Sequence, residues 1–101
     1  MYRPLPNGLT IKKSKVQGLG LFATKQFNAH VVLGMSHVMN KNFPHGSIRT
    51  ALGAFYNHSD KPNCEKVELK STNYTKYNLV AIKNIKAWEE LTVKYTFYNL
   101  K

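Results

Sequence analysis

Three adjacent polar residues, Asn57-His58-Ser59, stand out because they follow an apolar run from Ala51 to Tyr56. The apolar run can carry the three polar residues into the interior, where their amide, imidazole and hydroxyl groups need partners. Those partners are either neighbouring backbone groups or a polar ligand. A capped turn before Pro62 and a ligand site therefore stay open as equal alternatives.

Two glycines that bracket one residue, Gly18-Leu19-Gly20, form a second candidate. Glycine accepts positive φ and lets a ligand approach exposed backbone amides closely. The third glycine and the following helix of a dinucleotide site are missing. Taken alone, the motif favours a tight turn over a ligand-binding loop.

Other chemistries receive little support from the residue types. The single cysteine, Cys64, excludes an internal disulfide framework and a cysteine-based zinc finger. Ser59 and Cys64 lie near His58 in sequence, but a catalytic triad is defined by spatial roles, so a hydrolase is not indicated. No metal site is expected, because no ligand spacing relates the histidines at positions 30, 37, 45 and 58.

The elements that must position these residues are short segments with a period near two, separated by turn residues, which is typical of a mainly β domain. Residues 51–56 fit a helical turn or a strand equally well, and residues 42–47 and 60–63 are expected to be a loop and a turn. No long amphipathic helix, linker or repeat is visible, so residues 1–101 are expected to form a single domain. Strands are predicted over residues 9–13, 20–24, 31–35, 65–69, 77–82 and 91–95.

Composition narrows the class of protein further. The 101 residues include 15 Lys+Arg and 5 Asp+Glu, a formal charge of +10, and 43% are hydrophobic, which is too many for a disordered chain. No apolar run is long enough to span a bilayer and no apolar signal segment follows Met1, so an intracellular protein without membrane association is expected. The positive charge indicates either an anionic partner or simple solubility. Aromatic residues interleave with lysines after Tyr74, as they do on single-strand nucleic-acid surfaces and on half-buried strands.

Three motifs in this order resemble the SET-domain protein-lysine methyltransferases. Residues 13–23 are similar to the family's Gly-x-Gly loop and the Leu-Phe after it, and residues 54–64 contain its Asn-His-Ser-x-x-Pro-Asn motif. Residues 85–95 resemble its closing Gly-Glu-Glu-Leu-Thr-x-Asp-Tyr segment. The likeness extends from about Leu9 to Phe97.

The resemblance implies a β-clip of several small sheets with few short helices, in which the segments around Asn57 and Tyr95 cross in a knot-like arrangement. It also implies that S-adenosylmethionine binds in a cleft and leaves as S-adenosylhomocysteine after methyl transfer to a lysine of a protein substrate. Tyr95 would be the catalytic residue, and Tyr56 would contact the substrate. The residues implied to bind the cofactor are Gly18, Leu19, Gly20, Asn57, His58 and Tyr95.

The chain departs from the family pattern at several positions. Trp88 replaces a glycine, so the turn there is expected to be built differently. Lys94 replaces an acid, and strand alternation predicts that it shares an outer face with Thr92, opposite Leu91, Val93 and Tyr95. The segment between Met35 and Ala51 is short, and no cysteine-rich lid follows Tyr95. A catalytically weak or inactive cofactor-binding module therefore remains an alternative, as does a basic nucleic-acid-binding β domain.

The charge also bears on the partner. A protein of charge +10 repels a free, basic histone tail over roughly the Debye length of about 8 Å. The expected substrate is therefore an acidic protein, or a basic protein presented on nucleic acid, with an accessible lysine. Because the usual lid is missing, a homodimer is an alternative to a monomer.

Overall fold

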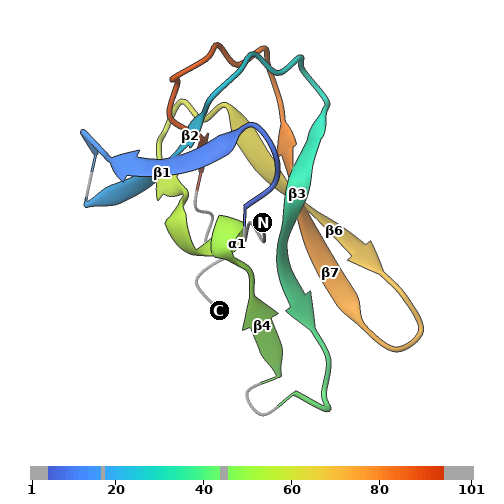
Figure 1. Ribbon diagram of the computed structural model, residues 1–101. Coiled ribbons are helices and arrows are strands. Elements are labelled where there is room, and N and C mark those ends of the chain that lie inside the picture. Colours follow the sequence, from blue (N-terminus) through green and yellow to red (C-terminus); the bar gives the residue numbers. More distant parts are fainter. Residues whose placement is uncertain (1–4, 17, 44–45, 95–101) are drawn as a thin grey trace.

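The computed structural model describes residues 5–16, 18–43 and 46–94 (Figure 1). In this part of the chain, strands dominate and the one helix is a short one. The elements are β1 (Leu9–Lys13), β2 (Leu19–Ala23), β3 (Val32–Met39), β4 (Ser47–Arg49), α1 (Ala51–Phe55), β5 (Asn57–His58), β6 (Cys64–Lys70), β7 (Thr75–Ala81) and β8 (Thr92–Val93).

Strands β1 and β2 form a separate two-stranded antiparallel sheet, which lies across the upper part of Figure 1. The register pairs Leu9 with Ala23 and Ile11 with Leu21. Leu9, Leu21 and Ala23 are buried, because period-two alternation turns all three side chains toward the core. The predicted strand over residues 9–13 is confirmed.

The second sheet has the order β4-β3-β7-β6-β8-β5. Its first four strands are antiparallel, and we call them the arm. Strand β8 then pairs in parallel with β5 on one side and with the start of β6 on the other. We call β5, β8 and the adjoining residues Asn63 and Glu90 the crossing, since two segments distant in sequence meet there. This mainly β architecture with a crossing near its C-terminal end confirms the expected fold class.

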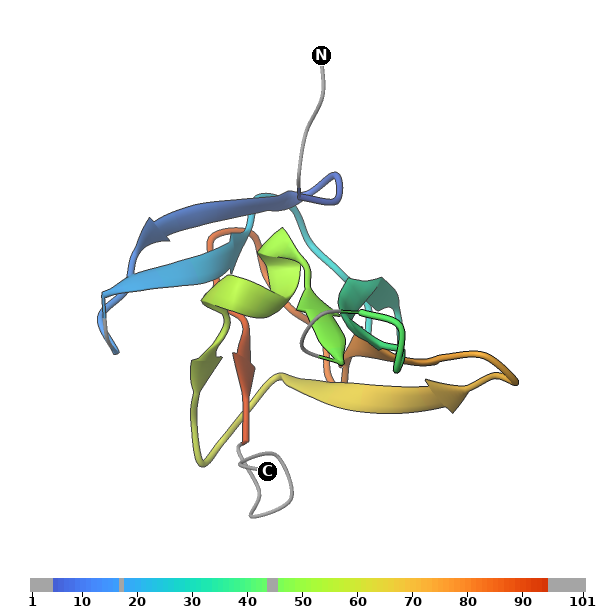
Figure 2. The ribbon, with the colours of Figure 1, turned by 90° about the horizontal axis from the view of Figure 1, so that it is seen from below.

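The segment from Ala51 to Tyr56, which the sequence left undecided, forms helix α1 over Ala51–Phe55. Thr50 caps the helix, because its hydroxyl accepts a hydrogen bond from the Gly53 amide at 3.2 Å and donates to the Met35 carbonyl at 2.6 Å. The helix contacts β2, β3 and β4, and Figure 2 shows it between the two sheets. A Cβ at Gly53 would collide with the Ser36 carbonyl, so glycine permits this close approach.

A single hydrophobic core joins the two sheets and the helix. Residues from both sheets and from α1 contribute to it, and no helix in the described part of the chain is long and apolar enough to cross a membrane. The core consists of Leu9, Leu21, Ala23, Leu33, Leu52, Tyr56, Cys64, Leu79, Ala81, Ile85, Leu91 and Val93.

Thr92, expected on the same face as Lys94, is buried rather than exposed. Leu91, Thr92 and Val93 are all buried, whereas Lys94 is exposed as expected. Strand β8 is flanked by β5 and β6 and is covered on both faces, so an outer face for Thr92 does not exist. Strand β3 is also longer than predicted and reaches Met39, because β4 and β7 pair with it on both sides.

Candidate functional site

The carboxylate of Glu90 is the centre of a polar cluster. The Ser14 hydroxyl lies 2.8 Å from each of its oxygens, and the Asn57 side-chain amide donates to its Oε2 at 2.7 Å. Ser14, Asn57 and Glu90 come from the first, second and third sequence motifs respectively. The structure therefore joins all three motifs at one carboxylate.

The chain before β8 holds Glu90 in place by pairing with β2. Glu90 forms an antiparallel bridge with Phe22, and the Leu91 amide donates to the Leu21 carbonyl at 2.8 Å. The Ala23 amide donates to the Glu89 carbonyl at 3.0 Å. These backbone bonds fix the Glu90 side chain beside the loop that connects β1 and β2.

Gly18 lies at the end of the connection between β1 and β2, Leu19 and Gly20 open strand β2, and the segment contacts this cluster. Gly18 has a φ of 50°, and its carbonyl accepts from the Ser14 amide at 2.7 Å. The Leu19 carbonyl accepts from the Asn57 amide group at 3.3 Å. A Cβ added at Gly20 would collide with the Glu90 carboxylate, so the glycine provides the space that the carboxylate occupies. The motif is therefore not a turn by itself: it joins the end of the connecting loop to the start of β2, and its backbone takes part in the cluster.

Asn63 is a buried support behind Glu90 and is only 4% exposed. Its side-chain amide donates to the Glu90 carbonyl at 2.8 Å, and its side-chain oxygen accepts from the Thr92 amide at 2.9 Å. Its own carbonyl accepts from the Ile82 amide at 2.9 Å. Asn63 therefore fixes the backbone on both sides of Leu91.

Sequence reasoning missed Ser14, Asn63 and Glu90 as members of the site, although all three lie in the motifs. A signal was present for Glu90, because the chain has only five acidic residues and two of them are adjacent at positions 89 and 90. An acid placed next to an apolar strand needs hydrogen-bond donors, which Ser14 and Asn57 supply.

His58 and Ser59 follow Asn57 along the chain and contact β8 and the turn at residues 60–63. His58 pairs with Val93, and its Nε2 lies 3.3 Å from the Asp60 carboxylate. The Ser59 hydroxyl accepts from the Lys61 amide at 3.0 Å, so the polar triplet includes the expected capped turn. Asn57, by contrast, faces the glycine loop.

Of the two tyrosines predicted as site residues, the structure describes Tyr56 but not Tyr95. Tyr56 is 9% exposed and belongs to the core, directly before β5. Tyr95 lies outside the described residues, which reach Lys94.

The turn at Trp88 is not built differently from a glycine turn, which corrects the expectation above. Trp88 itself adopts a φ of 69°, a left-handed conformation that is costly for a bulky residue. Its amide donates to the Ala23 carbonyl at 2.7 Å, and the Lys12 ammonium lies 5.2 Å from its ring. Because β2 fixes the turn, the backbone keeps its shape without glycine.

Cys64 does not serve as a nucleophile in this arrangement. Burial, together with the nearby Glu89 carboxylate, raises the pKa of the Cys64 thiol to about 12. The reactive thiolate is therefore suppressed at neutral pH. The described residues also contain no group of three His, Cys, Asp or Glu side chains that could hold a metal ion.

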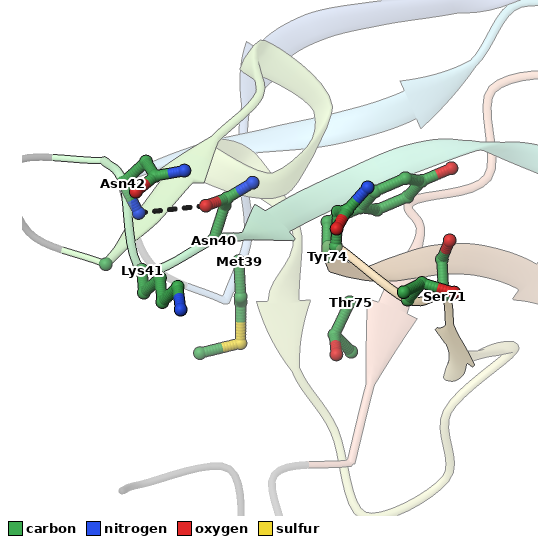
Figure 3. A pocket seen from close by; sticks show the side chains of 10 residues that line it. Met39, Asn40, Lys41, Asn42, Ser71, Tyr74 and Thr75 are labelled. Atoms are coloured by element: carbon green, nitrogen blue, oxygen red, sulfur yellow. Dashed lines mark hydrogen bonds between the residues drawn. The ribbon is translucent and has the colours of Figure 1, made fainter.

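One surface hollow lies away from the cluster, between the tips of the β3–β4 and β6–β7 hairpins (Figure 3). It has a volume of about 490 Å³, and polar turn residues dominate its lining. Asn40 accepts from the Asn42 amide at 2.8 Å on one wall, and Tyr74 lies on the other. A smaller hollow of about 310 Å³ lies at the end of β8, lined by Pro62, Cys64, Glu65, Lys66, Ile82, Val93 and Lys94.

Comparisons with known proteins agree with the motifs. Residues 34–96 match the SET domain family. The fold is similar to that of a candidate histone methyltransferase from Plasmodium falciparum, with a TM-score of 0.73, 22% identity, and coverage of 93% of this chain and 97% of that chain. It is also similar to part of a humanized mutant of Polycomb Repressive Complex 2 from Chaetomium thermophilum, with a TM-score of 0.72, 21% identity, and coverage of 89% of this chain and 15% of that chain. No curated protein sequence matches.

Proposed function

The chain belongs to the SET-domain family, whose match covers more than half of its length, and on this premise we propose that it transfers a methyl group from S-adenosylmethionine to a lysine side chain of a protein. Residues 1–101 form one catalytic domain in this proposal. An intracellular location is part of it, as the sequence indicates.

The observation that carries the proposal is the convergence of the three motifs on Glu90. The Asn57 side-chain amide donates to the Leu19 carbonyl at 3.3 Å and to the Glu90 carboxylate at 2.7 Å. Leu19 and Glu90 are 38 and 33 positions from Asn57 in the sequence. Beside this cluster, a Cβ at Gly18 would meet no atom within 4 Å, so the backbone there is open to an approaching ligand. An exposed loop backbone beside a fixed amide and carboxylate fits a ligand rich in polar groups.

In the proposed reaction, the site residues would bind the cofactor, position the binding groups or orient the substrate. The backbone of Gly18-Leu19-Gly20, together with Asn57 and His58, would bind the cofactor, and Glu90 and Ser14 would hold that loop and Asn57 in position. When bound, S-adenosylmethionine supplies a methyl group activated by its sulfonium. The Tyr95 hydroxyl would orient the neutral lysine amine in line with that methyl group, and Tyr56 would support the substrate side. Alignment and the exclusion of water are the main contributions such a transfer needs.

The charge of +10 directs the choice of substrate. We infer an acidic protein, or a basic protein presented on nucleic acid, because a free basic tail is repelled at long range. Equal methylation of a free basic peptide and of the same peptide on nucleic acid would contradict this choice.

Cofactor binding is tested with the product S-adenosylhomocysteine, which raises the melting temperature of a protein that binds it. The Gly20→Ala substitution displaces the Glu90 carboxylate from Asn57. We therefore expect the affinity of this variant for S-adenosylhomocysteine to fall by about tenfold or more. Gly46→Ala is the matched control, since a Cβ there meets no atom within 4 Å and the site is distant. The Gly46→Ala variant should be less stable, because alanine is strained at the φ of 78° that Gly46 adopts. Its affinity for S-adenosylhomocysteine should equal that of the wild type.

Catalysis is tested by transfer of a labelled methyl group to proteins of a cell lysate, followed by mass spectrometry. Tyr95→Phe removes the orienting hydroxyl and is expected to lower transfer by about a hundredfold while affinity for S-adenosylhomocysteine is kept. Undiminished transfer removes Tyr95 from the mechanism. Binding without transfer to any protein supports the inactive module, and salt-dependent DNA binding without cofactor affinity supports the nucleic-acid-binding domain.

A further inference from the structure

The outer face of the arm carries an unusual set of side chains. Figure 1 shows its four strands, β4, β3, β7 and β6, side by side, and directly paired residues of neighbouring strands point to the same face. The pairings define three rows on the face opposite the core: Ile48, Val38, Lys76 and Leu69; Met35, Asn78 and Val67; and Val32, Val80 and Glu65.

Seven of these ten residues are apolar, although the face is open to solvent. Val32 is 57% exposed, Ile48 50%, Leu69 42% and Met35 39%. The opposite face of the same strands supplies the buried core. An antiparallel sheet with one covered face usually presents polar residues on the other, so a contiguous apolar face marks an interaction surface.

The same face also carries no net charge. The chain has 15 Lys+Arg and 5 Asp+Glu residues, and these ten positions hold one positive residue, Lys76, and one negative residue, Glu65. The face is neutral as a whole, in contrast to the chain of charge +10 to which it belongs.

The two charges are arranged symmetrically about the middle row. Lys76 stands in the row before Asn78 on β7, and Glu65 stands in the row after it, paired with Val80. A two-fold axis that crosses the strands at the Asn78 row exchanges the first row with the third. In a face-to-face pair of sheets, each Lys76 would then face the row of the other copy that holds Glu65, with Glu65 on the neighbouring strand within reach of the lysine side chain.

We propose that this face is the interface of a homodimer, in which two arms pack face to face around that two-fold axis. Two-fold interfaces require a self-complementary surface, and apolar rows with one Lys and one Glu on opposite sides of the centre meet this requirement. An acidic partner fits the surface less well, because the face offers it a lone lysine. A repulsive charge of +10 on each copy also favours contact at a face that carries no net charge. This proposal does not depend on methyl transfer.

The test is a charge swap, read by sedimentation equilibrium at concentrations up to several hundred micromolar. We expect the wild-type chain to dimerise, and Lys76→Glu and Glu65→Lys each to weaken the dimer by about tenfold or more, since like charges then oppose one another across the axis. The double variant Lys76→Glu/Glu65→Lys restores the attraction and should dimerise again. An equimolar mixture of the two single variants should form heterodimers for the same reason.

The Lys13→Glu substitution, on the separate β1–β2 sheet, is the matched control for Lys76→Glu, because both lower the net charge by the same amount. It should leave the dimer intact, and thermal unfolding confirms that each variant is folded. A wild-type chain that is monomeric throughout overturns the proposal. So does a dimer that both single variants leave unchanged, or one that the double variant and the mixture fail to restore.

Discussion

The crossing and the arm arrange polar and apolar groups in opposite ways. In the crossing, the amide of Asn63 is buried and bonded to backbone on both sides of Leu91. In the arm, the side chains of Val32, Ile48 and Leu69 are exposed to solvent. Both regions belong to one sheet, so the difference does not come from the type of secondary structure.

The difference teaches how each region obtains its shape. Strands β5 and β8 contain two residues each, too few to hold a parallel pair by backbone bonds alone. Side chains such as Asn57, Asn63 and Glu90 supply the missing bonds. The arm has long antiparallel ladders that need no such help, which leaves its outer side chains available for another role.

The largest expected effect tests this contrast with two asparagines. Asn63→Ala leaves the Thr92 amide and the Glu90 carbonyl without their partner in a buried place, and should lower the free energy of unfolding by about 2–3 kcal/mol. Asn78→Ala, in the middle of the arm's outer face, should change it by about 0.5 kcal/mol or less. Urea denaturation measures both. Equal losses would mean that the crossing does not depend on its side chains.

A smaller effect is expected at Trp88, next to the crossing. Both Trp88→Gly and Trp88→Ala remove the contact with Lys12, but only glycine relieves the left-handed backbone. Trp88→Gly should therefore be more stable than Trp88→Ala by about 1 kcal/mol in thermal or urea unfolding. If the alanine variant is as stable as the glycine variant, the turn carries no strain.

The smallest effect is expected at His37, in the arm. Burial, with the nearby Lys66 and Arg49 charges, lowers the pKa of His37 below its ordinary value of 6.5. The unfolded chain then binds a proton more readily than the folded chain, so stability is full above about pH 7 and falls as the pH drops below 6.5 through the folded pKa.

Replacement of His37 by Gln removes this contribution. The loss of stability between about pH 7.5 and pH 5 should thus be smaller in His37→Gln than in the wild type, by less than about 1 kcal/mol. Denaturation at a series of pH values measures the difference. A variant with the same or a steeper loss would show that His37 does not contribute to the acid sensitivity.

Much of the fold was predictable because alternation and turn residues are local signals. The strand over residues 9–13 is confirmed, and the strands predicted over residues 65–69 and 77–82 correspond to β6 and β7, although their pairing as a hairpin was not predicted. Residues 51–56 were undecidable, since the helix depends on a Thr50 cap and on close contact with Ser36, which lies far away in sequence. The buried Thr92 was missed because alternation cannot reveal that both faces of β8 are covered.

For the site, the resemblance implied that the glycine segment and Asn57 share one cleft, but it did not imply that Glu90 joins them. That Glu90 joins them depends on pairing between β2 and the chain before β8, which is a long-range contact. The left-handed Trp88 was unpredictable for the same reason. The cofactor, substrate and catalytic roles of all the site residues remain predictions.

The position of β8 between β5 and β6 has a consequence for synthesis of the protein. Residues 57–58 find their strand partner only in residues 92–93, and β2 finds its outer neighbour only near Glu90. A nascent chain that has not yet reached Thr92 can form the β1–β2 and β6–β7 hairpins, but it must leave Asn57 and Asn63 without these partners. Contacts of such long sequence separation slow folding, so the domain should close late, after most of it has left the ribosome.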